Sequence, residues 1–143
     1  MNTLRQNTSN LDLYQYAEDN NIIVEHLDLK QNKSLSARIR NRDFIGLDNS
    51  ILNGSAVERT HLAHEIGHCA TGSFYEIESP LQVRGKYEYK AQKWAVLHLI
   101  PKVELLYLLK KNTPKWEIAE HFGISEQLID TAITYYFEYE VIK

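Results

Sequence analysis

Two histidines and a glutamate near the middle of the chain have the spacing of a metal-dependent hydrolytic site. His64 and His68 are four residues apart, which is about 40° round an α-helix and one turn along it, so both imidazoles can reach one cation. Glu65 then projects beside the cation, where a carboxylate can take a proton from an attacking water and pass it to a leaving amine. Cys69 is the only cysteine, which excludes a cysteine-rich zinc cage. The pattern predicts a zinc site built from histidine and carboxylate ligands.

Glu88, 20 residues after His68, is the expected third ligand. On a helix, small residues such as Ala91 and Ala95 lie within about 60° of it, so this face can pack closely against another helix. A carboxylate on such a face is costly to bury unless a positive charge meets it, and a zinc ion held by two histidines supplies that charge. Gln92 follows one turn later and is expected to hydrogen-bond a ligand imidazole.

Other reactive side chains near these motifs are expected to have lesser roles. His61 shares a helix face with His68, but a fourth protein ligand would close the open position of a catalytic zinc, so His61 is expected to line the cleft or support the ligands. His98 lies about 80° from the Glu88 face and Cys69 about 100° from His68, so we expect an ordinary histidine and a buried, inert thiol. Hydrolysis also needs a donor to the oxyanion, and three tyrosines close to the motifs leave that role open: Tyr75, Tyr87 and Tyr89.

Caps and prolines mark the helices that must position these residues. Ser55 and Glu58 have the form of a capping box, which opens a helix that runs to about residue 70 and is ended by Gly72. Two further helices are expected, one from about residue 86 to just before Pro101, and one over residues 102–111.

The first part of the chain predicts a short helix and a small sheet. Asn10 can cap a helix that ends at Asn20, and two extended runs follow at residues 22–29 and 35–47. Turns of the sheet are expected at Gly46, Asn53 and Gly54.

Three arginines alternate with other residues in the second extended run: Arg38, Arg40 and Arg42. A side-chain period of two places them on one strand face. This face is either solvated or a docking stripe for an acidic partner, because aligned like charges repel unless they are solvated or paired.

The last part of the chain predicts two short helices joined by a tight turn at Gly123, with the spacing of a helix-turn-helix. DNA binding is a rival interpretation, but the second helix, within residues 125–136, has no Lys or Arg to meet phosphate or guanine. We therefore expect a structural role, in which five residues close the core: Trp116, Ile118, Phe122, Leu128 and Ile129. The aromatic residues that follow are expected to be packing residues or a protein-docking edge: Tyr135, Tyr136, Phe137 and Tyr139.

The two motifs together resemble those of the ImmA/IrrE family of small zinc metallopeptidases. The first is the His64-Glu-Ile-Gly-His68 string, and the second joins Glu88, Ala91, Gln92 and a Trp-Ala pair to a Leu-rich segment that ends at Pro101. The resemblance covers about residues 22–133. Gln92 stands where the family usually has Asn, and one extra residue lies before Pro101, but neither departure touches the three ligands or the base.

The resemblance implies a gluzincin-like domain of the kind that phages and other mobile elements encode, often beside a repressor gene. Such proteins relieve repression by cleaving or otherwise disabling the partner repressor. The family also often ends in a helix-turn-helix-like segment, which matches the predicted carboxy-terminal helices.

Length and composition agree with one globular domain. The 143 residues are 43% hydrophobic and 24% charged, which is enough for a sizeable core. We expect a single α+β domain over residues 1–143, with a helix and small sheet in 1–54, zinc-site helices in 55–111 and a helical cap in 112–143. The net charge of −3 gives no basic footprint for nucleic acid. No run approaches the ~20 apolar residues of a membrane span, and residues 1–10 lack the apolar core of a signal peptide, so we expect a cytoplasmic protein.

These features predict a zinc-dependent endopeptidase that acts on a cytoplasmic protein, and the resemblance implies that the substrate is a repressor-type DNA-binding protein. Direct contact with nucleic acid or membrane is not expected. A substrate peptide is expected to add as an extended strand to the sheet edge near residues 43–47. The alternative is a binding module that captures a repressor or an antitoxin, with a structural or vestigial zinc site, because the same ligands hold a metal in either case.

Overall fold

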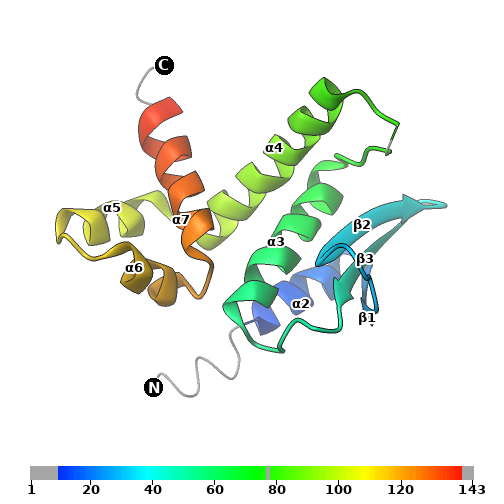
Figure 1. Cartoon of the computed structure of the whole chain (residues 1–143), viewed down its shortest axis with the longest axis horizontal. Coiled ribbons are helices and arrows are strands. Elements are labelled where there is room, and N and C mark those ends of the chain that lie inside the picture. The colour runs from blue at the N-terminus through cyan, green and yellow to red at the C-terminus, as the bar shows by residue number, and fades with distance from the viewer. Residues whose placement is uncertain (1–9, 77, 140–143) are drawn as a thin grey trace.

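The computed structural model describes residues 10–76 and 78–139, in which one small sheet lies at one side of the molecule and helices make up most of the rest (Figure 1). The strands are β1 (Ile22–Leu27), β2 (Ser34–Ile39) and β3 (Arg42–Asp48). Their order is β1-β3-β2, with β1 parallel and β2 antiparallel to β3. The expected α+β class is confirmed, with β3 as the central strand and β2 at an edge.

The single extended run predicted over residues 35–47 is wrong, because it contains a hairpin. Arg40 and Asn41 have φ of 54° and 65°, as a tight two-residue turn between twisted strands requires. Gly46, expected at a turn, lies inside β3 and pairs with Leu35.

The prediction that Arg38, Arg40 and Arg42 share one strand face is wrong for the same reason. Arg40 occupies the hairpin turn, and the register places Arg38 and Arg42 on opposite faces of the sheet. Arg38 instead forms an ion pair with Asp43, with Nε 2.6 Å from Oδ1, and also donates to the Cys69 carbonyl at 3.2 Å. Its charge therefore fastens the sheet to the end of the next helix.

The helices α3 (Ala56–Thr71) and α4 (Leu81–Leu99) carry the candidate site. The predicted cap of α3 is confirmed, since the Glu58 N–H donates to Ser55 Oγ at 3.0 Å, and Gly72 ends the helix with φ 64°. The predicted start of α4 near residue 86 is wrong. The helix begins at Leu81, because the Pro80 carbonyl at its N-cap already accepts a helical hydrogen bond from the Arg84 N–H at 3.1 Å.

A buried carboxylate joins α3 to the amino-terminal helix α2 (Leu11–Asp19). Asn10 makes no side-chain cap for α2, contrary to expectation, and its amide instead donates to Glu58 Oε1 at 2.5 Å. Tyr14 donates to Glu58 Oε2 at 2.6 Å and the Gly54 N–H to Oε1 at 2.8 Å. Glu58 is fully buried, so these donors replace the water it has lost.

The core lies on both sides of α3, which runs between the sheet and α4 (Figure 1). The two helices approach closely at Gly67, where an added Cβ would lie 2.5 Å from the Ala91 carbonyl oxygen. The largest fully buried apolar side chains of this region come from β3, α3 and the end of α4: Ile45, Leu47, Leu62, Ile66, Val96 and Ile100.

The carboxy-terminal helices are α5 (Lys102–Lys110), α6 (Lys115–Phe122) and α7 (Glu126–Ile133), followed by a π-helix over Thr134–Tyr139. The turn at Gly123 is confirmed, with φ 70°. The prediction that Trp116 belongs to the core is wrong. Its side chain is 58% exposed, because it lies about 200° round α6 from the buried Ile118. Tyr136 is buried and donates to the Ile100 carbonyl at 2.7 Å, while the side chain of Tyr139 lies outside the described residues. The other predicted core residues are buried: Ile118, Phe122, Leu128 and Ile129.

Among the described residues, no helix has the length and apolar character that a membrane span requires.

Candidate active site

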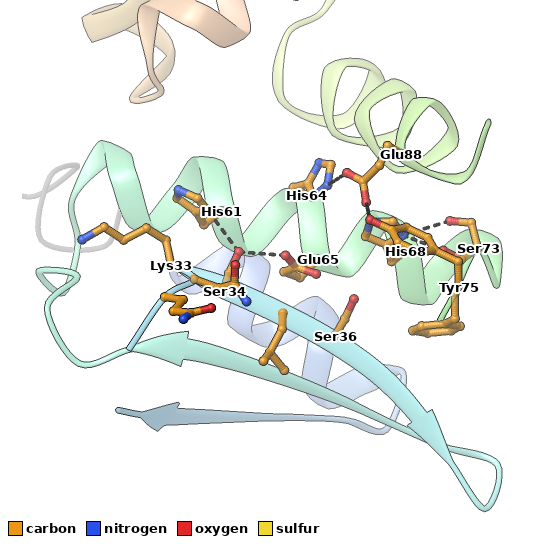
Figure 2. Close-up of a pocket in the computed structure, with 14 residues that line it drawn as sticks. Lys33, Ser34, Ser36, His61, His64, Glu65, His68, Ser73, Tyr75 and Glu88 are labelled. Atoms are coloured by element: carbon orange, nitrogen blue, oxygen red, sulfur yellow. Dashed lines mark hydrogen bonds and ion pairs between the residues drawn. The ribbon is translucent and has the colours of Figure 1, made fainter. Parts of the chain in front are cut away.

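The structure brings His64, His68 and Glu88 together across the α3–α4 contact (Figure 2). Both histidines project from α3 and the carboxylate from α4, and the three candidate ligand atoms lie within 4.8 Å of one another. His64 Nε2 is 2.8 Å from Glu88 Oε1, and His68 Nε2 is 3.0 Å from Oε2. Hydrogen bonds from the two histidines hold the pKa of Glu88 far below its usual range, so the carboxylate is charged at neutral pH.

Both imidazoles are held in the orientation that a metal ligand needs. His64 Nδ1 lies 2.9 Å from Gln92 Oε1, and His68 Nδ1 lies 2.6 Å from the Ser73 carbonyl oxygen. A carbonyl oxygen only accepts, so each Nδ1 carries a proton and each Nε2 is turned toward Glu88. The role expected of Gln92 thus corresponds to a contact in the structure, whereas the role of Ser73 was missed because a backbone carbonyl leaves no mark in the sequence.

The donor set fits a divalent metal ion. Burial lowers the pKa of His64, but the hydrogen bonds to Glu88 and Gln92 outweigh it and raise the pKa overall. The space between the two imidazoles and the Glu88 carboxylate therefore favours a positive charge, which a metal ion can supply in place of a proton on His64 Nε2. Two neutral imidazoles and one carboxylate are the ligands of many catalytic zinc sites, in which a fourth position stays open.

Glu65 lies one residue after His64 on α3, and its side chain faces the same pocket (Figure 2). It is 6% exposed, and its Oε2 accepts a hydrogen bond from Ser34 Oγ at 2.7 Å. His61 Nδ1 is 3.0 Å from the same hydroxyl, so His61 stands behind Ser34 and outside the group of three candidate ligands. Ser34 was missed at the sequence level because it belongs to a strand that only the fold brings over α3.

Of the three tyrosines near the motifs, Tyr75 is the one that reaches the candidate ligands. Its hydroxyl donates to Glu88 Oε2 at 2.7 Å, and its ring centroid lies 6.1 Å from that of His68. Tyr87 packs against Tyr75, and Tyr89 is 49% exposed. The hydrogen bond to Glu88, and then burial, raise the pKa of Tyr75 to about 12, so its hydroxyl keeps its proton near neutral pH.

The site opens into a pocket of about 550 Å³ between β2 and the α3–α4 pair. Ser34, Leu35 and Ser36 of β2 line one wall, and Phe74 and Tyr75 of the segment after α3 line another. The sheet edge expected near residues 43–47 is wrong, because those residues form the central strand. The edge strand beside the pocket is β2.

Two further residues singled out in the sequence lie away from this chemistry. Burial raises the pKa of the Cys69 thiol to about 12, with Asp43 and Glu65 adding to the shift, so the thiol is protonated and unreactive. His98 stacks on Trp94 with ring centroids 3.8 Å apart and contacts the Trp94 carbonyl oxygen through Nδ1. Both residues have the ordinary roles expected of them.

Comparison with known proteins agrees with the geometry of the site. Residues 17–134 match the model of the peptidase M78 family, described as the IrrE N-terminal-like domain. The searches of curated proteins and of solved structures gave no match. The family match covers most of the chain, including both motifs. The protein therefore belongs to the ImmA/IrrE family of metallopeptidases.

Proposed function

We propose that the protein is a zinc-dependent endopeptidase that cleaves a cytoplasmic protein, and that His64, His68 and Glu88 bind the metal. The observation that carries this proposal is the convergence of both His Nε2 atoms on the Glu88 carboxylate, with Glu65 beside them on α3. These three residues would hold the zinc ion, which would supply a Lewis acid to polarise the scissile carbonyl and to lower the pKa of the attacking water.

Glu65 is the general base in this proposal. Its position directly after a ligand on α3 places its carboxylate in the pocket without making it a fourth ligand. It takes the proton of the attacking water and then gives it to the leaving amine. Its low exposure keeps bulk water from competing for that proton.

Tyr75 is the donor that we assign to the oxyanion. It lines the pocket, and its hydroxyl carries the proton that such a donor needs. The contact with Glu88 shows that this hydroxyl reaches the candidate ligands. Substrate binding has to redirect it from the carboxylate to the carbonyl oxygen.

The edge of β2 is the proposed peptide-binding element. An edge strand has backbone N–H and C=O groups that can pair with an extended peptide. Since β2 lines the pocket, a peptide paired with it runs past the metal site in both directions. Cleavage within a chain, as an endopeptidase performs it, follows from that path.

The proposed partner is a repressor encoded beside this protein. Support for it comes from the ImmA/IrrE family, whose members of this kind relieve repression by removing or disabling a partner repressor. Proteolysis and capture would both disable the repressor, but only proteolysis needs the general base Glu65.

Glu65→Gln tests the proposal. The substitution conserves size and leaves the three ligands in place, so folding and zinc content should survive, while turnover should fall about 100-fold or more because an amide cannot accept the proton. The neighbouring repressor is expressed with wild-type or Glu65→Gln protein, and its chain length and operator occupancy are followed. Loss of intact repressor with wild type alone supports proteolysis. Equal release of the operator by both proteins, with the repressor intact, refutes the endopeptidase and leaves capture by binding.

A further inference from the structure

A chain of two hydrogen bonds joins the edge strand to the base. Ser34, the first residue of β2, has its hydroxyl 2.7 Å from Glu65 Oε2 and 3.0 Å from His61 Nδ1. Figure 2 shows this hydroxyl between the two side chains, on the side of α3 that faces the sheet. These hydrogen bonds join two elements, because Ser34 belongs to β2 and the other two residues belong to α3.

The direction of this chain follows from the protons available. The carboxylate of Glu65 only accepts, so the single hydroxyl proton of Ser34 must be donated to it. Ser34 Oγ can then only accept from the ring, so His61 presents Nδ1–H in either of its protonation states. The order is therefore His61 to Ser34 to Glu65, and each bond polarises the next.

The chain fixes the plane of the Glu65 carboxylate. The last torsion of a glutamate side chain has no sharp minimum, so an unrestrained carboxylate rotates. With Oε2 held by Ser34, the second oxygen is the one left to accept a proton. Ser34 in turn is held by its pairing with Leu47 of the central strand, so the restraint comes from a rigid element.

We propose that Ser34, oriented by His61, is the positioning residue that aims the Glu65 carboxylate and ties the peptide-binding strand to the base. The inference rests on the proposed function, in which Glu65 is the base and the edge of β2 binds the peptide. A peptide paired with β2 then contacts the same strand that orients the base, so β2 positions both the substrate and the Glu65 carboxylate.

Substitutions of Ser34 test this role. Ser34→Ala should lower kcat about 10- to 100-fold, the loss expected for a hydrogen bond to a charged group, with KM within about twofold of wild type and zinc content unchanged. Ser34→Thr keeps the hydroxyl and should restore most of kcat. Ser50→Ala is the matched control, because its hydroxyl donates to Asp48 in the turn after β3, outside the residues that line the pocket, and it should leave kcat within about twofold. Thermal melting checks that each variant folds.

His61 gives an independent arm. His61→Ala should lower kcat less than Ser34→Ala, and the double variant should lose no more than Ser34→Ala alone, because the two residues act in series. His61→Asn offers an amide N–H near the place of Nδ1–H and should recover part of the loss. Additive losses, a Ser34→Ala variant with unchanged kcat, or an inactive but folded Ser34→Thr would each overturn the proposal.

A spectroscopic measurement separates this proposal from the proposed function. The 15N spectrum of the wild-type imidazoles should show His61 protonated at Nδ1, and Ser34→Ala should shift that proton toward Nε2, the usual preference of a free ring. This result with an inactive wild type would support the chain of hydrogen bonds while the peptidase fails. Protonation of wild-type His61 at Nε2 alone would refute the chain whatever the activity.

Discussion

The side chains behind the imidazoles decide how well the site can hold a metal. His68 is anchored on a backbone carbonyl, which no side-chain substitution removes, whereas His64 depends on the amide of Gln92. An imidazole without such an acceptor can rotate or take the other tautomer, which turns its lone pair away from the metal. The two ligands therefore differ in how easily mutation disturbs them.

Replacement of Gln92 should weaken metal binding without abolishing it. Gln92→Leu removes the acceptor for His64 Nδ1, and zinc affinity should fall about 10- to 100-fold, as is usual when the partner of a ligand histidine is lost. His64→Ala removes a ligand outright and should abolish binding at comparable zinc concentrations. Competition with a chromophoric chelator measures both. Gln82→Leu is the control, since this exposed glutamine lies near the start of the same helix. Equal affinity of Gln92→Leu and wild type would show that the hydrogen bond does not support the ligand.

Tyr75→Phe should separate support of Glu88 from stabilisation of the oxyanion. Removal of one oxyanion donor costs about 10²–10³ in kcat, and this loss should persist when zinc is saturating. If Tyr75 acts only through the carboxylate, zinc affinity falls and excess zinc restores kcat. Turnover of a peptide taken from the proposed repressor substrate, measured across a zinc titration, distinguishes the two outcomes.

At the scale of elements, the distance between α3 and α4 sets the geometry of the ligands. Gly67 lies between the two ligand histidines in the chain and meets the backbone of Ala91, so the helices are as close as a residue without Cβ allows. The same contact brings Glu88 to the histidines, because the carboxylate lies one turn before Ala91 on α4.

Gly67→Ala should therefore damage both stability and metal binding. The new Cβ would lie 2.5 Å from the Ala91 carbonyl oxygen and 3.0 Å from its Cα, so the helices have to separate, at a cost of about 1–3 kcal/mol of unfolding free energy. Gly85→Ala is the matched control, because its Cβ meets nothing within 4 Å, and it should stabilise α4 by about 0.5–1 kcal/mol. Urea unfolding with and without zinc measures both effects. A Gly67→Ala protein as stable as wild type would contradict the close approach.

Acid should act on the turn after the sheet through Asp48. Its carboxylate accepts from the Ser50 hydroxyl, from the Leu29 N–H at 2.9 Å and from the Ser50 N–H at 3.0 Å, and these bonds lower its pKa from 3.8 to about 2. A pKa lowered by folding gives stability that is present above pH 3.8 and is lost as pH falls toward 2. Asp48→Asn should flatten the dependence of stability on pH in this window. Melting temperatures of both proteins between pH 2 and pH 5 check it, and parallel curves would remove Asp48 as the cause.

These elements differ in how much of them could be predicted from the sequence. The Ser55 hydroxyl caps the helix that follows it, and Gly72 and Gly123 adopt the positive φ that glycine favours, so the ends of α3 and α6 could be predicted from local sequence. The Arg40–Asn41 turn could not, because Arg has no preference for positive φ and only the pairing of β2 with β3 imposes it.

The candidate site divides in the same way. The proposed ligands His64 and His68 lie one turn apart on α3, which their spacing predicts. Ser34 and the Ser73 carbonyl meet α3 side chains across space, and no local pattern encodes such contacts.

At the scale of the whole molecule, the carboxy-terminal helices are attached to the metal-site helices through their apolar faces. Ile118, Leu128 and Ile129 are all but fully buried, and Tyr136 closes onto the end of α4 at Ile100. The turn between α6 and α7 also meets α3, since the Ser125 N–H donates to Thr60 Oγ1 at 3.0 Å. The carboxy-terminal helices therefore pack against α3 and the end of α4, the two helices that carry the candidate ligands.

The same helices should not recognise DNA. A recognition helix needs cationic side chains for phosphate and guanine, yet α7 contains no Lys or Arg, and Lys115 at the start of α6 is 3.1 Å from Asp130 on α7. With a net charge of −3, general attraction to phosphate is also missing. Electrophoretic shift with duplexes from the surrounding operator region, at moderate salt, should show no sequence-specific complex. The proposed repressor partner on the same duplexes is the positive control, and a specific complex of this protein alone at nanomolar concentration would restore the DNA-binding interpretation.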